Sequence, residues 1–138
     1  MNQIARILTQ SRTIAVVGLS CKAHRTSHEV ARFLQAHGYR IIPVNPSYAG
    51  TDILGERCHA TLQDAALALG ATRIDIVNCF RKAQDIAPVA QAAIDVKAAC
   101  LWMQLGITHQ ASADLACAAG LDVVMDRCIK IELLHMPK

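Results

Sequence analysis

Residues 14–29 read IAVVGLSCKAHRTSHE, and this stretch decides the fold. Its opening apolar run predicts a buried strand that ends in a tight turn at Gly18. A polar, partly basic loop follows, and Thr26 to Glu29 predicts a helix start, with Thr26 as the N-cap and Glu29 completing a capping box. A strand, a glycine turn and a helix N-terminus together favour a bound phosphate, because free backbone N–H groups and the helix dipole converge there.

Short apolar runs alternate with helical patterns along the rest of the chain. We expect further strands over residues 39–44, 74–79, 99–103 and 121–125, with a short edge strand over 57–60. We expect helices over residues 2–10, 26–37, 62–69, 84–97, 110–119 and 128–135. The strands are continuous apolar runs, which is typical of a parallel sheet covered on both faces. The sequence therefore predicts an α/β fold, namely one doubly wound, Rossmann-like domain over residues 1–138 with a mostly parallel sheet.

Composition narrows the classes of function. The 138 residues are 53% hydrophobic and 18% charged, which describes a globular domain. The net charge of +3 is small and scattered, which argues against nucleic-acid binding. The sequence has neither a signal-peptide pattern nor an apolar run long enough to cross a membrane, so we expect a cytoplasmic protein with no membrane association.

The six cysteines predict reduced thiols, because no C-x-x-C spacing is present and several of them fall inside apolar runs. His24 and His28 are four residues apart, but no third metal ligand is evident, so we expect no metal site. No G-x-S-x-G elbow or other nucleophile stands out, and we expect no catalytic residue.

Ligands of doubly wound sheets bind at the carboxyl ends of the strands, so the residues just after each strand matter most. After the first strand, Ser20, Arg25, Thr26 and Ser27 surround the predicted helix start, where Arg25 would contact a phosphate. The alternative is that Arg25 is an ordinary surface residue. After the second strand, Asn45-Pro46 stands where NAD enzymes usually carry an acid for the ribose, and no Arg follows for NADP. The missing acid and the single glycine argue against a nicotinamide cofactor.

Six segments in order resemble the small, stand-alone CoA-binding proteins, whose fold is similar to the CoA-binding domain of the succinyl-CoA synthetase alpha subunit. The resemblance runs from about Ile14 to Glu132. The matching segments are AVVGLS followed by RTS, GYRIIPVNP, ILGE, FR, WMQLGI and VVMDRC.

The resemblance implies roles for individual residues. Gly18, Ser20, Arg25 and Ser27 would hold the CoA phosphates. The adenosine would be bordered by Val44, Asn45 and Pro46, and Phe80 and Arg81 would close the pocket. The pantetheine arm would pass Trp102, Gln104 and Gly106.

The resemblance also implies a function. The synthetase performs its chemistry with a phosphorylated histidine in a further domain that these residues do not include, so we expect a non-catalytic protein that binds CoA or an acyl-CoA. The alternatives are a Rossmann-type NAD(P)-dependent enzyme, an enzyme that uses acyl-CoA, and a CoA-linked thiol redox protein. In the redox alternative the CoA thiol would meet Cys21, or Cys79 or Cys128 near the far end of the arm.

Two residues near the site have competing interpretations. Trp102 fits a strand core better than a ligand platform. Asp126 fits a structural role at a helix start better than a ligand contact, because an acid is stabilising there.

Overall fold

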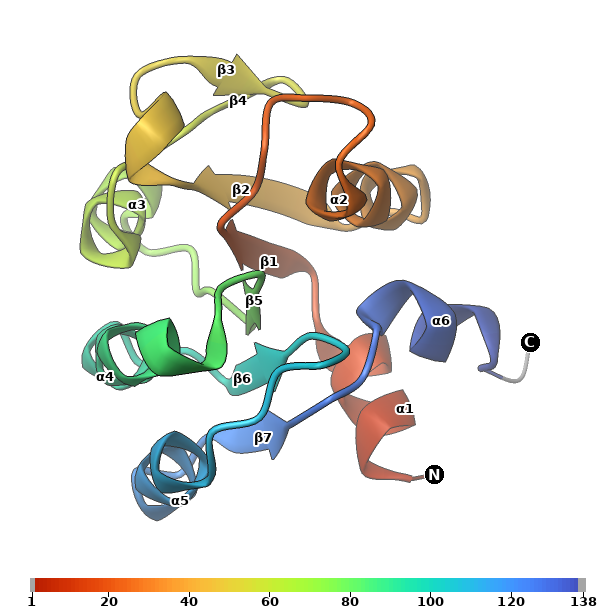
Figure 1. The fold of residues 1–138 in the computed structure, drawn as a ribbon, viewed down its shortest axis with the longest axis vertical. Coiled ribbons are helices and arrows are strands. Elements are labelled where there is room, and N and C mark those ends of the chain that lie inside the picture. Colours follow the sequence, from red (N-terminus) through yellow and green to blue (C-terminus); the bar gives the residue numbers. More distant parts are fainter. Residues whose placement is uncertain (1, 137–138) are drawn as a thin grey trace.

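The computed structural model describes residues 2–136, and its core is a five-stranded parallel sheet (Figure 1). The strands are β1 (Thr13–Val17), β2 (Arg40–Val44), β5 (Ile76–Cys79), β6 (Cys100–Met103) and β7 (Asp122–Val124). Their order is β2-β1-β5-β6-β7, and every neighbouring pair is parallel. Because the chain leaves β1 toward β2 on one side and returns to β5 on the other, the switch point lies between β1 and β5.

Helices cover both faces of the sheet, which confirms the doubly wound, Rossmann-like prediction (Figure 1). One face carries α1 (Gln3–Gln10), α2 (Thr26–Ala36) and α6 (Ile129–Leu134). The other carries α3 (Leu62–Leu69), α4 (Ile86–Asp95) and α5 (Gln110–Ala118). No helix in residues 2–136 is long and apolar enough to span a membrane.

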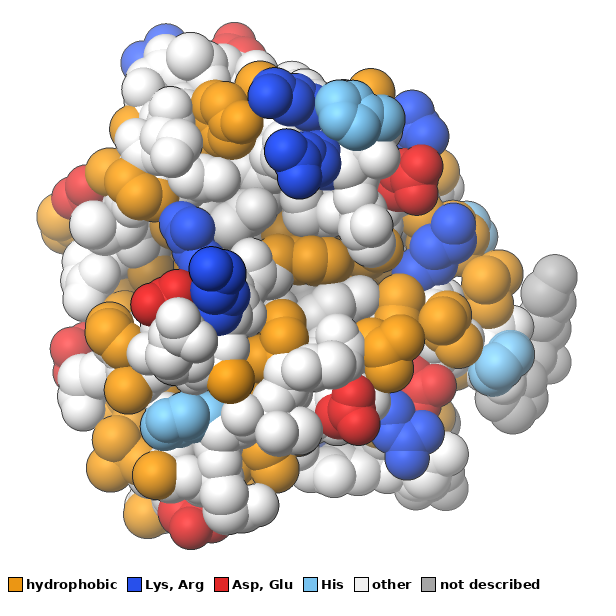
Figure 2. Space-filling view, viewed as in Figure 1, with side chains coloured by type: hydrophobic (Ala, Val, Ile, Leu, Met, Phe, Trp, Pro, Cys, Tyr) orange, Lys and Arg blue, Asp and Glu red, His pale blue; other side chains and the backbone are white. Residues whose placement is uncertain are grey.

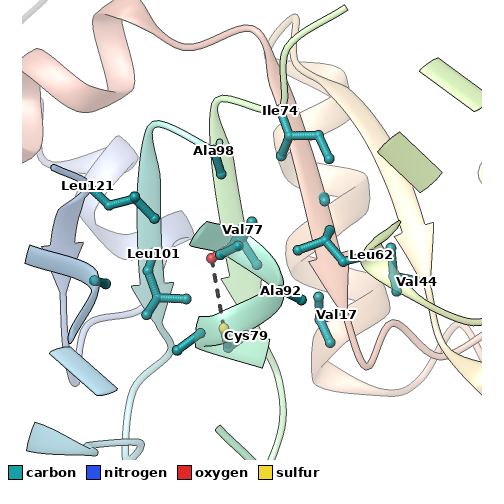
Figure 3. Close-up of a cluster of buried hydrophobic side chains, with 14 of the residues drawn as sticks. Val17, Val44, Leu62, Ile74, Val77, Cys79, Ala92, Ala98, Leu101 and Leu121 are labelled. Carbon is teal, nitrogen blue, oxygen red and sulfur yellow. Dashed lines mark hydrogen bonds between the residues drawn. The ribbon is translucent and has the colours of Figure 1, made fainter. Parts of the chain in front are cut away.

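The burial of the central strands explains why their sequences do not alternate. Every residue of β1, β5 and β6 is buried, so both faces of each strand carry mostly apolar side chains. Figure 3 shows one of the two cores, in which Val17 and Val44 at the strand ends lie beside Leu62 of α3 and Ala92 of α4.

Three local predictions differ from the structure in more than the position of an end residue. The edge strand expected over 57–60 is instead a short antiparallel hairpin of β3 (Asp52–Ile53) and β4 (Glu56–Arg57), followed by a single parallel bridge from His59 to Val44. The chain reverses between the two strands at Leu54 and Gly55, which both have positive φ.

The other two inexact predictions concern helix starts. The helix expected over 84–97 begins with a 3-10 turn, η2 (Ala83–Asp85), before α4. Thr26 was expected to cap α2, but the N-cap is Arg25, whose side chain makes no capping hydrogen bond. The Ser27 hydroxyl accepts a loop N–H instead, so side-chain bonding at this terminus serves the loop rather than the helix.

Gly18 has the tightest environment of the glycines. Its φ is +93°, and a Cβ built on it would lie 2.4 Å from the Phe80 carbonyl oxygen. Gly120 has a similar φ of +92° but open space around its Cβ position. Alanine substitutions at the two positions therefore separate the free-energy cost of backbone strain, which both share, from the cost of a steric clash, which only Gly18 has.

We predict that Gly18→Ala lowers the free energy of unfolding by roughly 2 kcal/mol or more beyond the loss caused by Gly120→Ala, because only Gly18 adds a backbone clash to a strained φ. Urea unfolding of both variants and the wild type measures the difference. Equal losses in the two variants would contradict the close packing of β1 against the segment after β5.

Candidate functional site

The turn after β1 joins three strand ends. The Gly18 N–H donates to the Val44 carbonyl at 2.8 Å, and the Phe80 N–H donates to the Val17 carbonyl at 2.8 Å. Since a Cβ at Gly18 would collide with Phe80, only glycine lets the β1 end approach the segment after β5 this closely. The turn thus places the loops after β1, β2 and β5 at one edge of the sheet.

The loop between β1 and α2 is held by its own hydrogen bonds. The Ser27 hydroxyl accepts from the Ser20 N–H at 3.1 Å, and the Ser20 hydroxyl accepts from the Lys22 N–H at 3.0 Å. The backbone N–H groups of Thr26 and Ser27 have no acceptor among residues 2–136. The first turn of α2 therefore presents free donors and the positive end of the helix dipole, an arrangement that attracts anions.

A polar hollow of about 380 Å³ opens at this turn. Its lining includes many of the residues singled out from the sequence: Gly18, Ser20, Arg25, Thr26, Ser27, Asn45, Phe80 and Arg81. Ser47 and Tyr48, from the 3-10 turn η1 (Pro46–Tyr48), complete it. Figure 2 shows Lys and Arg side chains on this face, both over the β1–α2 loop and over the segment after β5.

The two arginines of the polar hollow are available to a ligand. Neither Arg25 nor Arg81 has a carboxylate partner within 4.0 Å in the described part of the chain. The described residues that line the hollow include no Asp, Glu, His or Cys. Its charged side chains are therefore cations alone, which suits a phosphate and offers no general acid–base pair.

An apolar hollow of about 200 Å³ lies beside the polar one. Its lining includes three of the expected residues, Val44, Pro46 and Arg81, and Arg81 lines both hollows. The remaining lining residues were not expected from the sequence: Val17, Ala60, Thr61, Leu62, Gln63, Pro88, Val89 and Ala92. Several of these are core side chains of Figure 3, so the apolar hollow is the open end of the hydrophobic core. Such a surface suits a flat, apolar ring.

Most of the apolar-hollow residues missed by sequence reasoning lie in α3, in the segment just before it, or in α4. Thr61 caps α3 through its hydroxyl, which accepts from the Asp64 N–H at 3.1 Å. The capping pattern Thr61-x-x-Asp64 marks that helix start, but nothing in the pattern indicates that it faces the end of β2.

Asn45 acts mainly as a brace between loops. Its side-chain amide donates to the Leu19 carbonyl at 3.1 Å, and its side-chain oxygen accepts from the Ser47 N–H at 3.0 Å. The residue is 7% exposed. It therefore fixes the β1–α2 loop to the end of β2, at a position where a carboxylate would be needed to bind a nicotinamide cofactor's ribose.

The structure places Gln104 and Gly106 outside the linings of both hollows, at the end of β6. The Gln104 side-chain oxygen accepts from the Asn78 amide at 3.2 Å and from the Ile129 N–H at 3.3 Å. The Gly106 N–H donates to the Asp126 carboxylate at 2.7 Å, which gives Asp126 a structural partner. These bonds tie the β6 end to the segment that leads into α6.

Trp102 is fully buried, and its indole N–H donates to the Arg127 carbonyl at 2.8 Å. Its side chain therefore belongs to the core beneath this edge of the sheet, in agreement with the preferred interpretation of the sequence. Among residues 2–136, no group of three or more His, Cys, Asp or Glu side chains is arranged to hold a metal ion.

The three cysteines weighed for thiol chemistry differ in access. Cys21 is exposed, Cys128 is partly buried, and Cys79 is fully buried. Burial raises the pKa of the Cys79 thiol to about 12. Because the thiolate is the attacking species, we expect Cys79 to be unreactive in the folded protein at neutral pH.

Comparison with known proteins places these features in a family. The model of a family described as "CoA binding domain" matches residues 12–133. The uncharacterized protein YneT of Bacillus subtilis is 37% identical over 129 residues, covering 94% of this chain and 90% of YneT. A solved Thermus thermophilus structure superposes with a TM-score of 0.88 at 32% identity, covering 97% of this chain and 98% of that one. A hypothetical protein from Pyrococcus horikoshii gives a TM-score of 0.84 at 32% identity, covering 94% and 86%.

We predict that CoA disulfide modifies Cys21 or Cys128, and leaves Cys79 unmodified, when the folded protein is incubated with it at neutral pH. A cysteine thiolate would attack one sulfur of the reagent, forming a protein–CoA disulfide and releasing CoA thiolate. Peptide mass spectrometry locates the adduct, and protein unfolded in urea is the control in which Cys79 becomes reactive. An adduct on Cys79 in the folded protein would contradict its burial, and no adduct on any cysteine would remove the thiol redox alternative.

Proposed function

This chain belongs to the CoA-binding domain family, and we propose that it binds CoA or an acyl-CoA without catalysing a reaction. The observation that carries the proposal is the pair of adjoining hollows at the switch point. One is polar, cationic and set at a helix N-terminus, and the other is apolar and opens onto the core. Together they match a ligand that joins a pyrophosphate to an adenine.

In this proposal the pyrophosphate occupies the polar hollow. The free N–H groups of Thr26 and Ser27 and the guanidinium of Arg25 bind its oxygens, and the turn at Gly18 lets the ligand approach the backbone. The adenine enters the apolar hollow between Val44 and Pro46. Burying a ring there is favourable because apolar surface leaves water on both sides.

The pantetheine arm leads away from the polar hollow across the ends of β5 and β6. It first passes Phe80, which lines the polar hollow. It then passes Gln104 and Gly106, which line neither hollow. Neighbouring strands are about 4.8 Å apart, so β6 is reached roughly 10 Å from β1. This distance suits a long, flexible chain.

The absence of catalysis in this proposal rests on how the polar groups near the phosphates are used. The hydroxyls of Ser20 and Ser27 and the amide of Asn45 hold the loops by internal hydrogen bonds. A serine nucleophile needs an adjacent base, and the described lining of the polar hollow includes no histidine or carboxylate. The site is built to hold a ligand in place.

We predict that the protein binds CoA more tightly than NAD or NADP. The cationic hollow suits the phosphates of all three ligands. The ribose of a nicotinamide cofactor, however, lacks its usual acidic partner, because Asn45 occupies that position and braces two loops. Isothermal titration calorimetry with the three ligands measures the order of affinity. Tighter binding of NADP, or no heat of binding with CoA at saturating concentration, would overturn the proposed function.

We predict that Arg25→Ala weakens CoA binding by about 1.5–3 kcal/mol, which is roughly ten- to more than a hundredfold in affinity, because it removes a charge-assisted hydrogen bond to phosphate. The free energy of unfolding should change by less than about 0.5 kcal/mol, since Arg25 has no ion-pair partner among residues 2–136 to lose. Calorimetry and urea unfolding provide the two measurements.

The matched control for Arg25 is Arg32→Ala, which removes an exposed cation from the same helix but lines neither hollow. Arg32→Ala keeps a good helix former in α2 and lowers the net charge by the same amount as Arg25→Ala. Equal losses of affinity in the two variants would show that Arg25 contributes only through net charge.

A further inference from the structure

We propose that Arg81 is the residue that recognises the 3′-phosphate of the adenosine ribose, and so distinguishes CoA from the same molecule without that phosphate. This inference rests on the proposed function, because it names the part of the CoA ligand that Arg81 contacts.

The position of Arg81 between the two hollows is the first argument. Arg81 lines the polar hollow together with Arg25, and it lines the apolar hollow together with Val44 and Pro46. A ligand with its adenine in the apolar hollow and its pyrophosphate in the polar hollow must place its ribose at the boundary between them. That boundary is where the Arg81 side chain lies.

Charge is the second argument. Among all the residues that line either hollow in the described part of the chain, Arg25 and Arg81 are the only charged ones. CoA brings two separate phosphate groups, the pyrophosphate and the ribose 3′-phosphate. Arg25 precedes the free N–H groups of the α2 terminus, which suit the pyrophosphate. Arg81 is the remaining cation, and the 3′-phosphate is the remaining anion.

The backbone around Arg81 is anchored, which limits where its side chain can reach. The preceding Phe80 N–H donates to the Val17 carbonyl at 2.8 Å, and the Phe80 carbonyl packs against Gly18. Arg81 is partly exposed and has no carboxylate within 4.0 Å in residues 2–136. A guanidinium held in this way matches two phosphate oxygens at once, which gives it directional selectivity for phosphate.

The segment after β2 strengthens this assignment. Asn45, Pro46, Ser47 and Tyr48 follow that strand and contribute no cation to the apolar hollow. Recognition of a ribose phosphate from the β2 side would therefore lack a charge partner. The β5 side supplies one through Arg81.

The test compares CoA with 3′-dephospho-CoA by calorimetry on the full chain. The wild type should prefer CoA, and Arg81→Gln should lower its CoA affinity by roughly tenfold or more while leaving its dephospho-CoA affinity unchanged. Arg25→Gln should weaken both ligands by similar factors, since both carry the pyrophosphate. Lys82→Gln is the matched control, because it removes an adjacent exposed cation that lines neither hollow, and it should preserve the preference.

Arg81→Lys serves as a second variant, since it keeps the charge but loses the planar fork, and it should retain part of the preference. Equal weakening of CoA and dephospho-CoA by Arg81→Gln would overturn the inference and assign Arg81 to the adenine or the pyrophosphate. If Lys82→Gln lost the preference for CoA as well, the preference would be explained by the net charge of the protein rather than by Arg81. A wild type that binds neither ligand would instead overturn the proposed function itself.

Discussion

The close approach of β1 to the segment after β5 is the constraint on which the site depends. Gly18 has a positive φ and no room for a Cβ against the Phe80 carbonyl, and its N–H also bonds to the end of β2. Three strand ends are thereby held at one point. Residues next to this junction line both hollows, Val17 the apolar one and Gly18 the polar one, so backbone packing at the junction helps to set where the hollows lie.

From that junction the site is organised by hydrogen bonds that the protein makes with itself. Ser27 binds the Ser20 N–H, and Asn45 binds both the Leu19 carbonyl and the Ser47 N–H. These bonds fix the loops before any ligand arrives, so binding requires little ordering of the backbone, and less entropy is lost. The arginines at the rim are then free to meet phosphate.

The sequence predicted the fold well because buried parallel strands leave a clear signal. The apolar runs at β1, β5 and β6 and the glycine at position 18 were sufficient to indicate a doubly wound sheet with a phosphate-type turn. The roles of Thr26 and of the α3 and α4 residues around the apolar hollow were not predictable. Capping depends on whether a hydroxyl reaches its own helix or a nearby loop, and the lining depends on how helices distant in sequence pack beside the end of β2. Neither property is encoded in local spacing.

The same physics separates two kinds of polar residue at this edge of the sheet. Asn78 and Gln104 are buried, and the Asn78 amide N–H donates to the Gln104 side-chain oxygen, which also accepts from the Ile129 N–H. This pair links β5, β6 and α6, and the buried Asn78 side-chain oxygen is left without a partner among residues 2–136. Arg25 and Arg81 are at least partly exposed and have no carboxylate partner within residues 2–136, so their guanidinium groups are hydrated. Buried amides need partners within the protein because an unbonded polar group in the core is costly, whereas hydrated cations do not. Residues of the first kind therefore determine the shape of the site, and in the proposed function residues of the second kind select the anion.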